Sequence, residues 1–330
     1  MNIAFTDFWP DFNPETLLLT KLINMCSKDL QETKNLEVAD YLLFSCMGNQ
    51  HWNAPANVIK IFYTGECLTP DFNACDYAIG FDWLDFGDRY LRFPLYYLYT
   101  DICEQMETKH LKPIFEIVGD KTDFCSITVS NSNRNPIFKE LFEKLSIYKQ
   151  VDSGGRWMNN IGGTVQDKFA FDLSHKFSIV CENSSYPGYT TEKIVQAFAA
   201  NCIPIYWGDP FIAKVFNKKA FINVQDYASV NEVVEKVKEI DNSDNLYYEM
   251  LCEPALIDDK YTKNYQITVL EHFLSNIFVS PLSSVRRNRD FKGREYIERQ
   301  RNLYAHWNKP NVLIKLKMLA YGFLHHRLKI

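Results

Sequence analysis

Apolar runs alternate along the chain with segments whose apolar residues recur at helical spacing. Short runs rich in β-branched and aromatic residues predict buried strands, and apolar positions three or four residues apart predict helices. We expect strands over Asn2–Phe8, Tyr41–Cys46, Val58–Tyr63, Tyr77–Phe81, Phe124–Ser130, Phe177–Cys181, Ile203–Tyr206 and Phe221–Val224. We expect helices over Pro14–Met25, Pro136–Ile147, Thr191–Ala200 and Asn231–Ile240. This alternation is typical of parallel sheets covered by helices on both faces.

The alternation stops once and then restarts. Thr108–Asp123 is a polar stretch that contains Pro113 and Gly119, and we interpret it as a linker. A chain of 330 residues is long enough for about two domains. We therefore predict two Rossmann-like α/β domains that face a cleft, over residues 1–118 and 119–275, followed by a basic helical tail over 276–330.

The tail differs from the rest of the chain in charge. Residues 285–330 hold 12 Lys and Arg but 3 Asp and Glu, although the whole chain has a net charge of −5. Within the tail, Val312–Ile330 mixes apolar and basic residues with mediocre amphipathicity. Two interpretations stay open: an interfacial helix on an anionic membrane, and a helix packed along the body. Nucleic acid is not an expected partner, because the tail lacks aromatic residues interleaved for base stacking.

Composition narrows the class of protein. The chain is 46% hydrophobic and 23% charged, which is typical of a globular protein, and it has no apolar run of about 18 residues. Its N-terminus lacks the basic start of a secretory signal, so we expect a cytoplasmic protein, with the tail as a peripheral contact to the inner face of the cytoplasmic membrane. Nine cysteines without a Cys-x-x-Cys pair and seven histidines without ligand spacing predict no metal site.

The densest group of polar residues follows a predicted strand and opens a predicted helix, over Cys181–Lys193. A helix N-terminus carries unpaired N–H groups and a partial positive charge, which together bind anions. Lys193 in the first turn opposes the helix dipole, and a bound anion such as a phosphate would explain its position. A capped helix with a solvated lysine is the alternative.

Two further segments carry candidate chemistry. Ser153–Gly163 holds four glycines and Arg156, whose planar guanidinium is suited to a phosphate, although an ordinary loop is the alternative. Glu66 ends a predicted strand, where a carboxylate is suited to act as a general base or is simply a surface glutamate. The chain contains no Asp-x-Asp motif, so a diphosphate would be neutralised by Lys, Arg and backbone donors.

Together these segments resemble the α-1,3/1,4-fucosyltransferases of glycosyltransferase family 10, particularly the short bacterial members. The resemblance is most specific in FSIVCENSSYPGYTTEKIVQAFAANCIPIYWGDP, over Phe177–Pro210. It also includes FYTGE at Phe62–Glu66, DYAIGFDWLDFGDRYLRFPLYY at Asp76–Tyr97 and the SGGRWMNNIGG loop. It therefore extends from about Asn2 to Leu256.

The resemblance implies a GT-B fold with an acceptor-binding N-terminal domain and a C-terminal domain that binds GDP-fucose. It implies inverting transfer of L-fucose from GDP-β-L-fucose to the GlcNAc hydroxyl of a lactosamine-type glycan, with a Lewis-antigen-like product on a lipopolysaccharide or capsule glycan. Transfer of another nucleotide sugar and α-1,4 regiospecificity are the alternatives. The family implies no obligatory cofactor and leaves stimulation by Mn²⁺ or Mg²⁺ open.

The resemblance also assigns roles to single residues. Glu66 matches the general base, and Arg156 and Lys193 would balance the charge of the departing diphosphate. Three donor-contacting positions are matched by Asn183 and Tyr189, near the phosphates, and by Glu192, near the ribose or fucose. The chain departs from the family in the glycine loop, where some members carry an arginine at the position of Met158.

Overall fold

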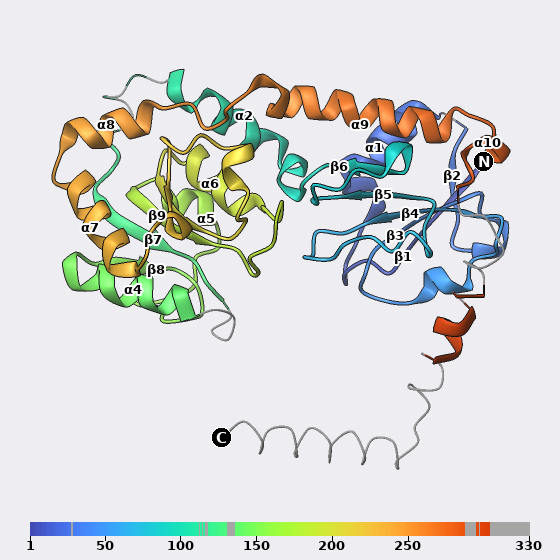
Figure 1. The fold of residues 1–330 in the computed structure, drawn as a ribbon, viewed down its shortest axis with the longest axis horizontal. Helices are drawn as coiled ribbons and strands as arrows, with labels where there is room; N and C mark the ends of the chain where they lie inside the picture. The colour runs from blue at the N-terminus through green and yellow to red at the C-terminus, as the bar shows by residue number, and fades with distance from the viewer. Residues whose placement is uncertain are drawn as a thin grey trace, which may run out of the picture.

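The computed structural model describes residues 1–27, 29–111, 113, 115, 118–130, 136–287, 295–296 and 298–303, which form two lobes side by side (Figure 1). The first lobe is built on a six-stranded, fully parallel sheet in the order β2-β1-β3-β4-β5-β6. Its strands are β1 (Asn2–Thr6), β2 (Gln31–Glu32), β3 (Tyr41–Phe44), β4 (Ile59–Tyr63), β5 (Tyr77–Gly80) and β6 (Tyr90–Arg92). The predicted strands are confirmed, and the sequence missed the two short edge strands β2 and β6.

The second lobe is built on a five-stranded, fully parallel sheet in the order β11-β10-β9-β7-β8. Its strands are β7 (Asp123–Ile127), β8 (Val151–Ser153), β9 (His175–Cys181), β10 (Ile203–Trp207) and β11 (Ile222–Asn223). The helices that cover the two sheets are α1 (Leu18–Cys26), α2 (Thr100–Thr108), α4 (Pro136–Tyr148), α5 (Lys168–Asp172), α6 (Glu192–Ala199), α7 (Val230–Asp241), α8 (Asp244–Cys252), α9 (Lys263–Phe278) and α10 (Leu282–Val285). The four predicted helices are confirmed: they are α1, α4, α6 and α7. The sequence missed helices α2, α5, α8 and α9 and the edge strand β8.

Two helices pack away from the sheet that their chain position suggests. Helix α2 lies within the predicted first domain but packs against α6 of the second lobe. Helix α9 lies almost wholly within the predicted second domain, but it runs along the first lobe beside α1 (Figure 1). The Tyr41 hydroxyl donates a hydrogen bond to the Ile277 carbonyl at 3.2 Å and thereby fixes the end of α9 to β3. The two lobes therefore differ from the predicted domains, residues 1–118 and 119–275, in the placement of α2 and α9.

The predicted linker Thr108–Asp123 is anchored at both ends. Lys109 is buried, and its Nζ donates to the carbonyls of Leu251 and Glu253 at 2.8 and 2.7 Å. Lys121 is also buried, and its Nζ donates to the Ala200 carbonyl at 2.7 Å. The expectation of a loose linker is therefore wrong at its two ends, because both buried ammonium groups are held by backbone oxygens of the second lobe.

The start of the basic tail contacts the first lobe. Arg287 pairs with Asp88 at 2.5 Å, and its backbone N–H donates to Asp76 at 2.8 Å. The Tyr77 hydroxyl donates to the Val285 carbonyl at 2.6 Å. The segment Val312–Ile330, predicted as a helix, lies outside the described residues. Within the described part of the chain, no helix has the length and apolar character needed to cross a bilayer.

Candidate active site

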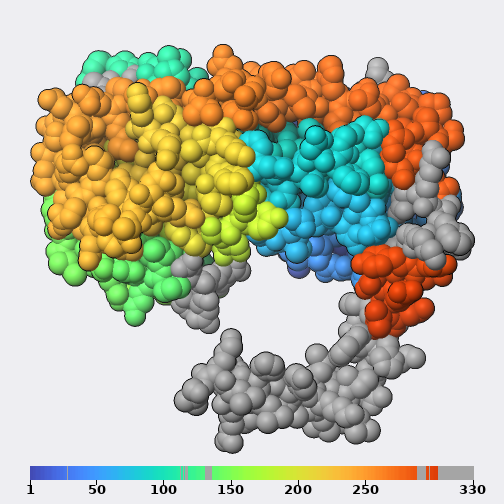
Figure 2. Space-filling view, viewed as in Figure 1, coloured from blue at the N-terminus to red at the C-terminus, as the bar shows by residue number. Residues whose placement is uncertain are grey.

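The two lobes touch (Figure 2), and among the segments that meet there are loops beyond the carboxyl ends of β5 and β9. The loop between β9 and α6 approaches the loop after β5 so closely that a Cβ at Gly188 would lie 2.5 Å from the Phe81 carbonyl oxygen. The Phe81 ring centre lies 5.1 Å from that of Tyr189 and 5.8 Å from that of Tyr186. Ligands of open parallel sheets bind at such edges, so this junction is the candidate active site.

Glu66 lies on the first-lobe side of the junction. It follows β4, its side chain is exposed, and its backbone N–H donates to the Thr64 hydroxyl at 3.1 Å. Tyr189 of the second lobe is close enough to feel its charge: burial first, and then the carboxylates of Glu182 and Glu66, raise the pKa of the Tyr189 phenol. The charge of Glu66 in the first lobe therefore acts on Tyr189 in the second.

Lys193 has a counterion within the protein, which the sequence argument did not foresee. Its Nζ lies 2.9 Å from the Glu182 carboxylate and 2.9 Å from the Thr191 hydroxyl. Burial lowers the pKa of Lys193, but the charges of Glu182 and Glu192 outweigh burial and raise it. An external anion is therefore not needed to explain this lysine, and the interpretation as a solvated lysine is also wrong. The Lys193 side chain is 27% exposed.

Glu182 organises the helix start that carries Lys193. Its side chain is fully buried at the end of β9, and its two carboxylate oxygens accept the N–H and the hydroxyl of Thr191, both at 2.8 Å. Thr191 is the N-cap of α6, but its hydroxyl bonds to Glu182 rather than to the helix. A buried carboxylate at a helix N-terminus is stabilised by the helix dipole. Glu182 therefore fixes the first turn of α6.

A second buried carboxylate shapes the same loop. Asp209, at 1% exposure, accepts the N–H of Gly188 at 2.7 Å and the Thr190 hydroxyl at 3.1 Å. Burial raises its pKa, although these hydrogen bonds act in the opposite direction. Tyr189 lies between the two bonded residues and is 3% exposed. Asp209 therefore sets the backbone on either side of Tyr189.

The remaining predicted residues of this loop lie at its surface. Asn183 is exposed directly after β9, and Glu192 is half-buried as the first residue of α6. Both follow the carboxyl end of β9, at the same edge as Tyr189 and Lys193. The structure therefore places four of the predicted donor residues, Asn183, Tyr189, Glu192 and Lys193, in one loop and helix start.

The glycine loop with Arg156 lies beyond β8, at the edge of the second sheet. The Asn159 side chain shapes this loop: its Nδ2 donates to the carbonyls of Ser153, Gly155 and Gly163 at 3.0, 2.8 and 2.9 Å. Arg156 is exposed, and within the described part of the chain its guanidinium has no hydrogen-bond or ion-pair partner. No described contact joins it to Glu66 or Lys193. Its predicted phosphate role stays a prediction.

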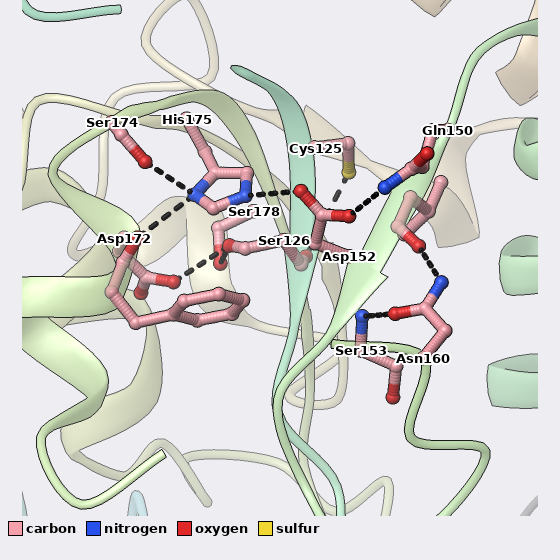
Figure 3. Close-up of polar contacts among 12 residues, drawn as sticks. Cys125, Ser126, Gln150, Asp152, Ser153, Asn160, Asp172, Ser174, His175 and Ser178 are labelled. Carbon is pink, nitrogen blue, oxygen red and sulfur yellow. Dashed lines mark hydrogen bonds and ion pairs between the residues drawn. The ribbon is translucent and has the colours of Figure 1, made fainter. Parts of the chain in front are cut away.

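A buried polar network supports the strand from which the glycine loop leaves (Figure 3). His175 at the start of β9 lies between the Phe171 carbonyl, 2.8 Å from Nδ1, and the Asp152 carboxylate of β8, 3.2 Å from Nε2. Deeper in the sheet, the Ser126 hydroxyl donates to the Asp172 carboxylate at 2.6 Å. Buried polar groups with satisfied hydrogen bonds rigidify a core. The network therefore fixes β8 relative to β7, β9 and α5.

Comparisons with known proteins agree with this architecture. Residues 3–99 match the alpha-(1,3)-fucosyltransferase FucT N-terminal domain, and residues 118–252 match the C-terminal domain of glycosyltransferase family 10 (fucosyltransferase). The alpha-(1,3)-fucosyltransferase FucT of Helicobacter pylori is 38% identical over 229 residues, which are 61% of this chain and 48% of that protein. A crystal structure of an alpha1,3-fucosyltransferase with GDP-fucose is similar at a TM-score of 0.68 and 30% identity, covering 83% of this chain and 90% of that chain. The chain belongs to glycosyltransferase family 10.

The family membership confirms the predicted α/β fold of GT-B type with two Rossmann-like lobes. A second crystal structure, of alpha1,3-fucosyltransferase, is similar at a TM-score of 0.73 and 29% identity, covering 88% of this chain and 93% of that chain. This family 10 chain spans about half the length of the Helicobacter pylori relative. Within the described residues, no group of three or more His, Cys, Asp or Glu side chains is placed to hold a metal ion.

Sequence reasoning missed the acidic residues that organise the site of this family 10 chain. Glu182 lies within the polar segment that the sequence singled out, and Asp209 ends the TyrTrpGlyAsp run after β10. Their position directly after buried strands was a usable signal, because strand ends of parallel sheets meet at one edge. Only the structure shows that Glu182 accepts hydrogen bonds from Thr191 and Lys193, and that Asp209 accepts them from Gly188 and Thr190.

Proposed function

We propose that this chain is an inverting α-1,3-fucosyltransferase that moves L-fucose from GDP-β-L-fucose to the GlcNAc hydroxyl of a lactosamine-type glycan. The observation that supports it is the contact between the two lobes at Phe81 and Tyr189, which joins the loop after β5, the strand beside that of Glu66, to the loop that leads to Lys193. A solved relative is described with GDP-fucose, and four of the predicted donor residues of this chain, Asn183, Tyr189, Glu192 and Lys193, follow β9 in its second lobe.

The proposed chemistry is a single displacement. The acceptor oxygen attacks the anomeric carbon of fucose while the bond from that carbon to the β-phosphate oxygen of GDP breaks, which inverts the anomeric configuration. The proton of the acceptor hydroxyl passes to the Glu66 carboxylate. Positive charge develops on the sugar ring and negative charge on the diphosphate. A carboxylate on one side and cations with a helix N-terminus on the other match this separation of charge.

The hydrogen-bond capacity of Lys193 is compatible with a phosphate contact. An ammonium group has three donors, and the Glu182 carboxylate and the Thr191 hydroxyl take two of them. The third donor remains for a phosphate oxygen of GDP. Arg156 would add the second cation, from the glycine loop after β8. We propose the donor site as Asn183, Tyr189, Glu192, Lys193 and Arg156.

A thermal-shift series with GDP, UDP, ADP and CMP tests the donor part of the proposal. At a ligand concentration about 100 times Kd, binding to the native state adds about 2.7 kcal/mol to the free energy of unfolding. A protein of this size then melts a few degrees higher. We expect this shift with GDP alone. A shift with UDP and none with GDP would leave the family assignment intact and refute the proposed donor.

The catalytic part is tested with Glu66→Gln, which removes the base but keeps the shape of the side chain. We expect the loss of at least about a hundredfold in fucosyl transfer, with the GDP-induced thermal shift retained. Glu37→Gln is the matched control, because Glu37 is an exposed carboxylate that precedes β3 and so lies at the opposite edge of the sheet. Near-normal turnover of the Glu66 variant would assign the base to another residue. NMR of the product distinguishes an α-1,3 from an α-1,4 linkage.

The cytoplasmic location, an anionic membrane as partner of the basic tail, a glycan of lipopolysaccharide or capsule as acceptor, and stimulation by Mn²⁺ or Mg²⁺ are also part of the proposal. Each rests on the sequence patterns described above. Binding of the full chain to anionic vesicles, measured against RNA at the same ionic strength, tests the role of the tail.

A further inference from the structure

A second carboxylate lies beside Glu66 at the junction of the lobes. Strands β4 and β5 pair in parallel, and their last pair in register is Tyr63 with Ile79. Glu66 and Asp82 each follow three residues after that pair, so the two acidic residues leave adjacent strands at the same level. The Cys67 thiol lies near both: its pKa is raised first by burial, then by the charge of Asp82, and more weakly by that of Glu66.

The two carboxylates have different surroundings. Glu66 is exposed, whereas Asp82 is 7% exposed. The Tyr186 hydroxyl of the second lobe lies near the Asp82 carboxylate, and hydrogen bonding to it lowers the pKa of Asp82. One of its two carboxylate oxygens, Oδ2, is buried and has no hydrogen-bond partner among the described residues. Burial raises the pKa of Asp82, although Tyr186 and the charge of Arg92 act in the opposite direction.

An unpaired buried carboxylate oxygen costs free energy, and native structures hold few such groups, so each calls for a partner such as a substrate, a water or an ion. A suitable ligand carries an O–H or N–H group, and it must fit beside Glu66, which leaves the adjacent strand at the same level as Asp82. A sugar meets both conditions, because each of its hydroxyls donates one hydrogen bond and a carboxylate accepts it strongly. A diphosphate does not, because it would bring negative charge next to Asp82.

We propose that Asp82 binds a non-reacting hydroxyl of the acceptor sugar, next to the hydroxyl that Glu66 deprotonates. Asp82 is then a specificity-determining residue of the acceptor site, and this assignment rests on the proposed function. It lies in the first lobe, on the strand adjacent to that of the general base. The contact selects acceptors that carry a hydroxyl at one position relative to the reacting oxygen, and it disfavours sugars without one.

A structural role for Asp82 makes different predictions. If its carboxylate only holds the lobes together through Tyr186, then Tyr186→Phe, which removes that hydrogen bond, reproduces the effect of Asp82→Asn. If Asp82 binds the acceptor through Oδ2, Tyr186→Phe leaves the acceptor contact in place. Asp85 supplies the matched control, since it is an exposed carboxylate three residues further along the same loop.

The experiment measures fucosyl transfer by wild type, Asp82→Asn, Asp85→Asn and Tyr186→Phe against a panel of monodeoxy acceptors. We expect Asp82→Asn to raise the KM for the intact acceptor about tenfold or more, with the KM for GDP-fucose and the GDP-induced thermal shift unchanged. One monodeoxy acceptor is penalised at least tenfold with wild type and with Asp85→Asn, but much less with Asp82→Asn. If Asp82→Asn fails to fold, the proposal is still tested with wild type, for which we expect the same penalty on one monodeoxy acceptor.

Three results overturn the proposal. The first is an acceptor KM of Asp82→Asn equal to that of wild type, and the second is a rise that Tyr186→Phe reproduces in full. The third is a change in the KM for GDP-fucose instead, which would place the contacted hydroxyl on the donor fucose. In each of these cases wild type still transfers fucose, so the proposed function stands. A wild-type enzyme that transfers no fucose from GDP-fucose in the same assay refutes the proposed function itself.

Discussion

At the scale of single residues, the site is held by buried carboxylates whose partners are cationic or polar. Glu182 is the clearest case, because its fully buried carboxylate accepts hydrogen bonds from both Thr191 and Lys193. Glu182→Gln keeps the shape but removes the charge and leaves the Lys193 ammonium without a counterion. Breaking a buried ion pair by removing one partner costs about 3–5 kcal/mol. We expect a loss of about 3 kcal/mol in the free energy of unfolding, measured by urea denaturation.

Glu192→Gln is the matched control for this prediction. Glu192 is the neighbouring carboxylate on α6, and its charge also raises the pKa of Lys193, but it is half-buried and makes no described ion pair. We expect Glu192→Gln to cost less than about 1 kcal/mol, as exposed pairs do. Equal losses for the two variants would mean that long-range charge, rather than the buried hydrogen bonds of Glu182, stabilises the helix start.

At the scale of elements, the conformation of the glycine loop is held by hydrogen bonds to a single side chain, that of Asn159. The Asn159 amide bonds to three carbonyls, and its oxygen accepts the Gly163 N–H at 3.1 Å. Asn159→Ala releases these groups and leaves Arg156 on a looser loop. We expect GDP affinity to fall about tenfold, or 1.4 kcal/mol, measured by isothermal titration. We expect the Asn159→Ala, Arg156→Ala double variant to lose little more GDP affinity than Arg156→Ala alone, because Asn159 acts by positioning Arg156.

Asn160→Ala is the comparison for the loop. Asn160 bonds to β8, where its oxygen accepts the Ser153 N–H at 2.7 Å and its Nδ2 donates to the Val151 carbonyl at 2.8 Å. It therefore extends the strand rather than closing the loop. We expect a smaller loss of GDP affinity than for Asn159→Ala. Additive losses in the double variant would show that Asn159 does not act through Arg156.

The sequence predicts elements best where apolar residues are continuous or regularly spaced. Strands such as β3, with four consecutive buried residues, follow directly from their apolar runs. Helix α9 carried a usable signal that the sequence reasoning left out, because its buried Leu270, Leu274, Ile277 and Phe278 have helical spacing. Helix α2 carried a weaker hydrophobic signal in the sequence, since only Cys103 and Met106 are buried along it.

The candidate site was predictable in part, for a physical reason. Glu66, Tyr189 and Lys193 lie in contiguous motifs, so a resemblance along the chain identifies them. Asp82 and Glu182 derive their importance from contacts that the chain order does not contain: strand register in the first case, and a fully buried ion pair in the second. The packing of α2 and α9 on the opposite lobes could not be predicted either. Periodicity predicts that a helix buries one face, but it does not identify the element against which that face packs.

At the scale of the whole molecule, the two lobes share one apolar core that joins the first sheet, α6 and α9, and they touch again at the candidate site. Gly188 lies at a close point of that second contact. Its φ is +87°, and a Cβ there would lie 2.5 Å from the Phe81 carbonyl of the other lobe. Any side chain at this position must therefore separate the two loops or shift the segment that begins α6. The close approach of the two lobes at this point therefore requires a residue without a Cβ atom.

This geometry gives a prediction with a nearly ideal control within the same chain. Gly162 has a φ of +85°, but no atom lies within 4 Å of the position of its Cβ. Gly162→Ala therefore measures the cost of an alanine at positive φ alone, about 1–2 kcal/mol. Gly188→Ala adds the collision with Phe81, and we expect it to lose about 1–3 kcal/mol more in the free energy of unfolding. Because Tyr189 and the start of α6 move with Gly188, we also expect fucosyl transfer to fall at least tenfold. Equal losses of stability and unchanged transfer would show that the two lobes separate at this point without cost, and that catalysis does not need the contact.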